Sequence, residues 1–332
     1  MEKTFVDNII GEKITFMKSK KFKLKSNMKI YLAIIFFLLV IIDKLVFRFI
    51  INFRITDEIY FDQYETYIYK EIREKLLKTK CSNMWNNQRE FLNGIIRKIR
   101  PKKSLELGVS FGGSSIIILN AIKDIENSHL YSIDTNNNSL TGSCVYNNFS
   151  YLIDKWTLFK GGIAADFANK IPKDIDFVML DTRHVEPGEI LDFLMILPFL
   201  KEEAWVLFHD IDHQITWAQG KKVKTKWAPY IIFNLIRGEK FLPSGNGIFN
   251  KDIGAIKLEK NQKRFIHDYC RALGSQWEYY PGEKVIKNVI NFFIKYYDDT
   301  CLNILREAVD FNRKIFKDNY APFLILAKKL KK

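Results

Sequence analysis

Several common signatures of ligand-binding proteins are missing from this 332-residue sequence. It contains neither Gly-x-Gly-x-x-Gly nor Gly-x-x-x-x-Gly-Lys-Ser/Thr, which excludes the standard dinucleotide fingerprint and the P-loop. It has only four cysteines, with no Cys-x-x-Cys pair and no spacing that we interpret as a metal site. We therefore expect four free, buried thiols in a reducing compartment, at Cys81, Cys144, Cys270 and Cys301.

The composition is that of a folded α/β protein with a basic surface. An apolar content of 47% over 332 residues suffices for the core of one large domain with extensions. The net charge of +14 suits an anionic partner such as membrane lipid, acidic glycan or nucleic acid. Lysine is spread along the whole chain, so a solvated surface explains much of this charge equally well. No nucleic-acid motif is present, and we expect no nucleic-acid partner.

A glycine-rich stretch, KSLELGVSFGGSS at residues 103–115, has the pattern of a strand, a tight loop and a helix start. The strand ends in small apolar residues, and the apolar segment 114–122 predicts a buried helix. Ser114 is a good N-cap residue, and a helix N-terminus suits an anionic ligand group. The turn between strand and helix uses three glycines, Gly108, Gly112 and Gly113.

A second acidic residue follows at the distance that one β-α-β unit requires. Residues 129–133 read as the next strand, and Asp134 stands at its end, 26 positions after Gly108. A carboxylate in this place can accept hydrogen bonds from ribose hydroxyls. The stretch therefore predicts a nucleoside-containing ligand.

These motifs together resemble the class I S-adenosylmethionine-dependent methyltransferases. The resemblance rests on Glu-x-Gly-x-x-x-Gly-Gly-Ser from Glu106, on YSIDT at 131–135 and on the run 175–212, and it covers roughly residues 85–259. The sequence is most similar to metal-assisted O-methyltransferases that act on sugars or catechols. The resemblance implies a Rossmann-like, seven-stranded, mostly parallel sheet flanked by helices, with S-adenosyl-L-methionine as cofactor.

The same resemblance assigns candidate cofactor contacts. The glycine loop would hold the methionine end and Asp134 the ribose, while Gly162 would lie near adenine, although Gly-Gly is also an ordinary turn. The candidate cofactor-binding residues are Glu106, Gly108, Gly112, Gly113, Ser114, Asp134 and Gly162.

Candidate catalytic residues follow two further predicted strands. The apolar run Ile175–Leu180 leads into Asp181-Thr-Arg-His184, and the strand 204–208 leads into His209-Asp210. Asp181 and Asp210 are suitable oxygen ligands for Mg²⁺, which could polarise an acceptor hydroxyl. A neutral His184 could remove the hydroxyl proton.

One position departs from the family pattern. In the sugar O-methyltransferases that the chain resembles, an Asp-x-x-His supplies a metal ligand and the base, and the later strand ends in two acids. Here His209 replaces one of those acids, so it either ligates a softer divalent ion or hydrogen-bonds Asp181 or the substrate. Whether a metal binds, and which one, stays open at this point, and Asp181 and Asp210 could also be plain turn residues.

The N-terminus is predicted to associate with a membrane. Residues 1–29 carry eight lysines against three acids and precede the apolar run 30–42, which as a helix reaches only about 20 Å. Charged residues interrupt its continuation to residue 53, so a transmembrane helix, a helix lying in the interface and a buried helix are all open. Because a single span would place the remainder outside, away from the cofactor supply, we expect attachment at the cytoplasmic face.

The rest of the chain is predicted to frame the catalytic domain. Residues 57–79 and 84–99 read as helices, 214–227 as a basic lid with two tryptophans, and 254–258 as a strand that closes the sheet in an antiparallel hairpin. The expected parts are a basic segment (1–29), a hydrophobic helix (30–53), a helical connector (54–100), the methyltransferase domain (101–260) and a helical C-terminal extension (261–332).

The sequence thus predicts a membrane-associated O-methyltransferase that acts on a sugar hydroxyl of a polysaccharide or lipid-linked precursor. Two alternatives remain: the same cofactor-binding fold with hydroxylase-like or polyamine-forming chemistry, and a membrane-bound scaffold without turnover. The acceptor, the ion and a homo-oligomeric state are not determined by the sequence.

Overall fold

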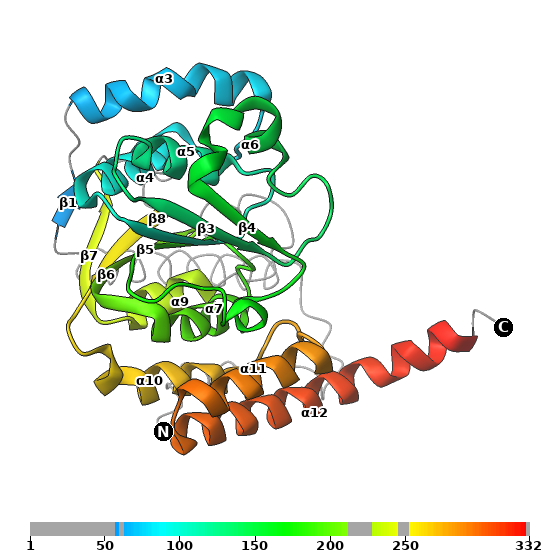
Figure 1. Ribbon diagram of the computed structural model, residues 1–332. Helices are drawn as coiled ribbons and strands as arrows, with labels where there is room; N and C mark the ends of the chain where they lie inside the picture. Colours follow the sequence, from blue (N-terminus) through cyan, green and yellow to red (C-terminus); the bar gives the residue numbers. More distant parts are fainter. Residues whose placement is uncertain (1–56, 60–62, 212–227, 245–251, 330–332) are drawn as a thin grey trace, which may run out of the picture. The chain divides into compact units, whose positions relative to one another are not determined.

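The computed structural model describes residues 57–59, 63–211, 228–244 and 252–329 (Figure 1). The predicted basic segment (1–29), the predicted hydrophobic helix (30–53) and the predicted lid (214–227) lie outside these residues. Within the described ranges, no helix combines the length and the apolar character that crossing a membrane requires. The described residues belong to one compact unit.

A single mixed sheet of eight strands forms the centre of this unit, in the order β1-β7-β8-β6-β5-β2-β3-β4. All neighbouring strands are parallel except β8, which runs antiparallel to both β6 and β7. The predicted closing hairpin is therefore confirmed. The strands are β1 (Asp57–Ile59), β2 (Lys103–Leu107), β3 (His129–Asp134), β4 (Trp156–Lys160), β5 (Ile175–Leu180), β6 (Leu200–His209), β7 (Gly238–Pro243) and β8 (Ile253–Leu258).

A short edge strand, β1, is added to the predicted seven-stranded sheet. β1 pairs in parallel with β7 at the edge of the sheet, although its residues were predicted to begin a helix. The helix that follows starts only at Gln63. Three residues are too few to show an alternating pattern, so pairing with a distant edge strand overrides the local preference.

Helices cover both faces of the sheet (Figure 1). On one face α3, α4 and α5 pack together, and on the other α7 and α9 contact β5 and β6, with α10 packed on α7. The helices are α3 (Gln63–Thr79), α4 (Asn86–Ile99), α5 (Gly113–Ile122), α6 (Ser143–Asn148), α7 (Gly188–Ile196), α9 (Ala228–Leu235), α10 (Ile266–Arg271), α11 (Glu283–Tyr296) and α12 (Asp299–Lys329).

Helix α5 shows why the core lies where it does. Its sequence, GSSIIILNAI, has no polar face, and all ten of its residues are buried. A helix that is apolar on every side needs partners on every side. Here α3 and α4 cover it from outside and β3 lies beneath it, so the glycine loop before α5 is held at the edge of the core.

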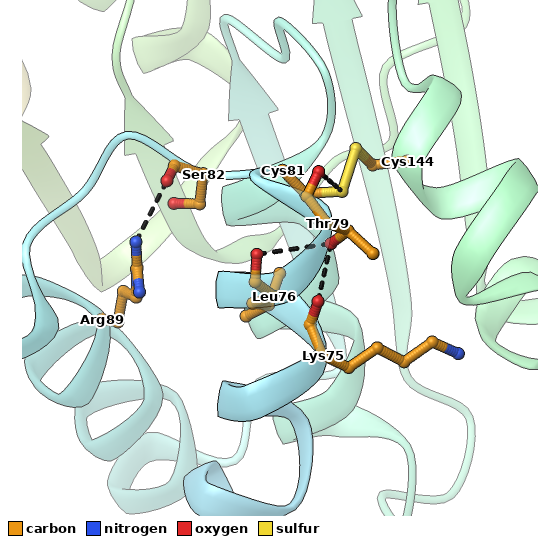
Figure 2. The surroundings of a disulfide bond; sticks show 7 residues. All are labelled: Lys75, Leu76, Thr79, Cys81, Ser82, Arg89 and Cys144. Carbon is orange, nitrogen blue, oxygen red and sulfur yellow. Dashed lines mark hydrogen bonds between the residues drawn. A yellow bond between two sulfur atoms is a disulfide. The ribbon is translucent and has the colours of Figure 1, made fainter.

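A disulfide joins Cys81 to Cys144, and it overturns the expectation of four free thiols. The bond links the segment after α3 to helix α6, with the two Cα atoms 5.9 Å apart (Figure 2). The two cysteines are 63 residues apart in sequence, and only the packing of α3 and α6 on the same side of the sheet brings them together. Cys270 and Cys301 are free and buried, as predicted.

Candidate active site

A cavity of about 740 Å³ opens at the carboxyl ends of the parallel strands. This volume and position suit a small-molecule ligand in an open α/β sheet. Most of the residues predicted from the sequence line it, whereas Glu106 and Gly112 do not. The predicted residues that line the cavity are Gly108, Gly113, Ser114, Asp134, Gly162, Asp181, His184, His209 and Asp210.

Glu106 supports the glycine loop from below. Its side chain is buried and accepts hydrogen bonds from the hydroxyls of Ser114 at 2.6 Å, Ser115 at 2.6 Å and Ser132 at 2.7 Å. Burial raises the pKa of the Glu106 carboxyl to about 7, against the lowering effect of these hydrogen bonds. Glu106 therefore ties the start of α5 to β3 and reaches the cavity only through Ser114.

Asp134 organises the other side of the same loop. Its Oδ2 accepts hydrogen bonds from the backbone N–H groups of Val109 at 2.9 Å and Ser110 at 3.0 Å. Its Oδ1 accepts one from the N–H of Asn136 at 2.7 Å. A carboxylate has about four acceptor positions, so one remains for a ligand hydroxyl at the cavity surface.

The glycines are needed because other parts of the chain approach them closely. Gly108 has a φ of +88°, and a Cβ there would lie 1.8 Å from the backbone oxygen of Asp181. A Cβ on Gly113 would lie 2.4 Å from the backbone oxygen of Cys81. The loop is therefore wedged between the end of β5 and the disulfide-bonded segment, and any side chain would force these apart.

His184 lies between carboxylates at the centre of the cavity rim. Its Nε2 is 2.9 Å from Asp210 Oδ2 and 3.7 Å from Asp181 Oδ1, and its Nδ1 is 3.0 Å from Glu189 Oε1. Burial alone would lower the pKa of His184, but the hydrogen bonds and charges of Asp210 and Glu189 raise it to about 11. The imidazole is thus fixed at both nitrogens and holds a proton strongly.

His209 packs against the same carboxylates. Its Nδ1 is 3.5 Å from Asp181 Oδ1 and 3.2 Å from Asp210 Oδ1, yet neither ring nitrogen makes a hydrogen bond of good geometry. Burial lowers the pKa of His209, but the nearby charge of Asp181 and then of Asp210 raises it to about 9. Buried ring nitrogens usually have a hydrogen-bond partner or a metal ligand. A cation or a substrate hydroxyl bound beside the two carboxylates would provide one for His209.

The donor set fits a divalent cation. One ligand atom each from Asp181, His184 and Asp210 can be chosen so that all three lie within 4.8 Å of one another. Two carboxylates and an imidazole, with His209 adjacent, suit an ion that accepts both oxygen and nitrogen, such as Mn²⁺, Fe²⁺ or Zn²⁺, as well as Mg²⁺.

Several residues of the site were not predicted from the sequence. Glu189, in the first turn of α7, is fully buried and orients His184; its only sequence signal was an acid at a helix start. The C-terminal part of the chain supplies a cavity wall of Tyr279, Pro281, Val285 and Val289. The Arg183 guanidinium lies 4.3 Å from the centre of the Tyr279 ring and lines the same wall.

The disulfide-bonded segment supplies the opposite wall. Residues 81–84 line the cavity next to the glycine loop. Arg89 Nη2 donates a hydrogen bond to the backbone oxygen of Ser82 at 3.0 Å, which fixes this segment to α4 (Figure 2). The cavity is therefore enclosed by segments from both ends of the described chain.

Comparisons with known proteins agree with this arrangement. A family model described as "Methyltransferase domain" matches residues 105–211, which contain the glycine loop, Asp134, Asp181, His184, His209 and Asp210. A search of curated proteins gives no match.

The chain is also similar to solved structures. An O-methyltransferase from Bacillus cereus in complex with SAH is 14% identical, with a TM-score of 0.44, over 57% of this chain and 90% of that one. The O-methyltransferase TomG from Streptomyces achromogenes, in complex with SAM, is 16% identical, with a TM-score of 0.43, over 60% and 92%. At these sequence identities and TM-scores, the similarity does not identify the acceptor substrate of this chain.

The family match covers the segment from β2 to the end of β6, which contains the glycine loop and the cavity rim of Asp181, His184, His209 and Asp210. Over residues 105–211 the chain is therefore similar to methyltransferase domains.

Proposed function

We propose that this protein is an O-methyltransferase that moves the methyl group of S-adenosylmethionine to an acceptor hydroxyl on a sugar. The observation that carries this proposal is the placement of His184 between Asp210 and Glu189, beside the glycine loop of a methyltransferase domain. In this position the His184 side chain would accept the proton of a hydroxyl that attacks the donor methyl group.

The glycine loop and Asp134 would hold the cofactor. The free N–H groups at the start of α5 would face the methionine carboxylate, and the remaining acceptor position of Asp134 would take a ribose hydroxyl. The acceptor would then lie between the loop and the wall that Tyr279 and Arg183 form. A planar ring of Tyr279 with a cation beside it suits a polar ring such as a sugar.

The reaction needs one nucleophilic displacement and one proton transfer. The acceptor oxygen would bond to the methyl carbon as the carbon–sulfur bond breaks, giving a methyl ether and S-adenosylhomocysteine. The hydroxyl proton would pass to His184 Nε2, while Glu189 holds the proton on Nδ1 and so fixes the ring.

A divalent ion would fit Asp181, His209 and Asp210, which leaves His184 Nε2 free to take the proton of the acceptor hydroxyl. When bound, it would lower the pKa of the acceptor hydroxyl and offset the charge of Asp210, one of the two carboxylates that raise the pKa of His184. His184 would then be unprotonated at working pH, as a general base must be.

The location of the protein is a separate proposal. Residues 30–53 would attach the chain to a membrane, as expected from the sequence. The Cys81–Cys144 disulfide is typical of oxidising compartments, whereas the proposed use of S-adenosylmethionine favours the cytoplasmic side, so these two features point to opposite orientations. Labelling intact cells with a membrane-impermeant probe for exposed lysines would distinguish the two orientations.

Methyl transfer from labelled S-adenosylmethionine tests the activity directly. We expect label in sugar acceptors, stimulation by a divalent ion after chelation, and loss of turnover in His184→Ala with cofactor binding intact. His129→Gln is a matched control, because His129 begins β3 at the far end of the sheet. Cofactor binding without transfer to any hydroxyl acceptor would leave only the fold and contradict the proposed reaction.

A further inference from the structure

A second cluster of metal-ligand side chains lies outside the cavity, where α10 meets the start of α12. His267 and Cys270 are three residues apart on α10, and Asp298 and Cys301 are three residues apart at the start of α12. Residues at this spacing share one face of a helical turn. Two ligand pairs thus face each other across the contact between these helices.

The distances within the cluster are short. His267 Nε2 is 2.7 Å from Asp298 Oδ2, and ligand atoms of His267, Asp298 and Cys301 all lie within 4.8 Å of one another. Asp298 Oδ1 also accepts a hydrogen bond from the N–H of Cys301 at 2.9 Å. That bond fixes the carboxylate at the helix start and leaves Oδ2 directed to the cluster.

A second thiol, that of Cys270, lies beside the group on its inner side, outside the set of atoms within 4.8 Å of one another. Cys270 and Cys301 are both fully buried, and their side chains form a hydrogen bond to each other. His267 and Asp298 are partly exposed, with 42% and 54% of their side chains accessible. The cluster therefore has a buried sulfur half and a surface half through which an ion can enter.

We propose that His267, Asp298 and Cys301 bind a zinc-type divalent ion, and that the thiol of Cys270, which lies beside Cys301, turns toward the ion as the fourth ligand. Two thiolates, one imidazole nitrogen and one carboxylate oxygen form a four-ligand set of the kind that Zn²⁺ takes with tetrahedral geometry. Magnesium and calcium, which prefer oxygen ligands, do not suit it. With four protein ligands no position stays open, so the site is structural.

The position of the cluster gives the ion a role. Its two ligand pairs bracket residues 271–297, the segment that supplies Tyr279, Pro281, Val285 and Val289 to the cavity wall. Helix α10 in turn packs on α7, which carries Glu189. An ion that clamps α10 to α12 would hold this wall in place.

The test uses the purified full-length protein. After dialysis against a weak chelator, we expect mass spectrometry to detect bound zinc in the wild type. The variants Cys301→Ser and Cys270→Ser should have lost this zinc. Cobalt substitution should give a thiolate-to-cobalt charge-transfer band. Among the described residues, the candidate active-site cavity has no free cysteine, so this band reports only the second cluster.

Two controls separate this cluster from other effects. Asp268→Asn changes an exposed acid on the same helix, which pairs with Arg271, and should keep both zinc and band. Asp181→Asn, in the candidate active site, should also keep the band, so failure of the proposed methyl transfer would not affect this result. Circular dichroism would confirm that each variant is folded.

Two results would overturn the proposal. One is folded wild-type protein without bound zinc or a cobalt–thiolate band, and with two free thiols after unfolding. The other is a second disulfide between Cys270 and Cys301 in the purified protein, since an oxidised pair cannot bind the ion.

Discussion

Breaking the Cys81–Cys144 disulfide is expected to weaken both the fold and cofactor binding. The bond joins residues 63 positions apart, and the loop-closure entropy of a cross-link of that length corresponds to about 4 kcal/mol of folding stability. Typical domains are stable by only about 5–15 kcal/mol. Reduction should therefore lower the urea midpoint of unfolding clearly while leaving a folded protein.

The effect on binding follows from the cavity wall. The bond holds residues 81–84 against the glycine loop, where the backbone oxygen of Cys81 sits directly over Gly113. Without the disulfide this segment becomes mobile and must be ordered again when the cofactor binds. The conformational entropy lost then costs about 1 kcal/mol or more of binding free energy for each mobile residue. We expect the Kd of S-adenosylhomocysteine to rise about tenfold or more on reduction.

The assay compares two proteins under two conditions. Urea unfolding and calorimetric titration with S-adenosylhomocysteine would be measured with and without a phosphine reductant, for the wild type and for Cys81→Ser/Cys144→Ser. The double variant should match the reduced wild type and should not respond to the reductant. Equal stability and equal Kd for oxidised and reduced wild type would refute the reasoning.

Three other substitutions test the site. In Glu106→Gln, the fall in stability between about pH 4.5 and 7 should be smaller than in the wild type by about 3 kcal/mol, because the raised pKa of Glu106 favours the folded state only while that carboxyl is protonated. Glu186, Glu189 and Asp192, whose pKa values are also raised, account for the fall that remains. Urea unfolding across that range measures the difference. Gly108→Ala should destabilise the protein by several kcal/mol and abolish cofactor binding, because its Cβ would overlap Asp181; calorimetry and thermal unfolding report both. Glu189→Gln should reduce kcat about tenfold to a hundredfold with little change in cofactor Kd, since His184 loses a charged hydrogen-bond partner.

Each of these has an outcome that would contradict it. An unchanged pH profile in Glu106→Gln would mean that the buried carboxyl is ionised in the wild type. Wild-type binding by Gly108→Ala would mean that the loop and β5 do not meet as described. A loss of cofactor affinity equal to the loss of rate in Glu189→Gln would assign Glu189 to folding and not to the orientation of His184.

The central sheet and its loop could be predicted because their signals are local. The run IDFVML is apolar except for Asp176, because helices cover the sheet on both faces (Figure 1). The residue after each parallel strand reaches the same rim. The spacing from Gly108 to Asp134 follows from one β-α-β unit. These patterns depend on neighbours in sequence, so the residues alone determine them.

The remaining features depend on contacts between distant segments. The disulfide, the wall residue Tyr279 and the pairing of His267 with Asp298 each join positions that no local pattern relates. Glu106 was assigned to the cofactor because its position matched a motif, whereas its burial beneath three serines is visible only in the folded chain. His267 and Cys270 have a recognisable spacing, but an isolated pair says nothing about its partners.

Titration with S-adenosylhomocysteine tests the central claim most directly. The account predicts one binding site per chain, lost in Asp134→Asn and kept in both His184→Ala and the exposed control Asp154→Asn, while methyl transfer is lost in His184→Ala alone among the variants that bind. Absence of binding by the wild type, or binding that Asp134→Asn leaves unchanged, would contradict a cofactor site at this edge of the sheet.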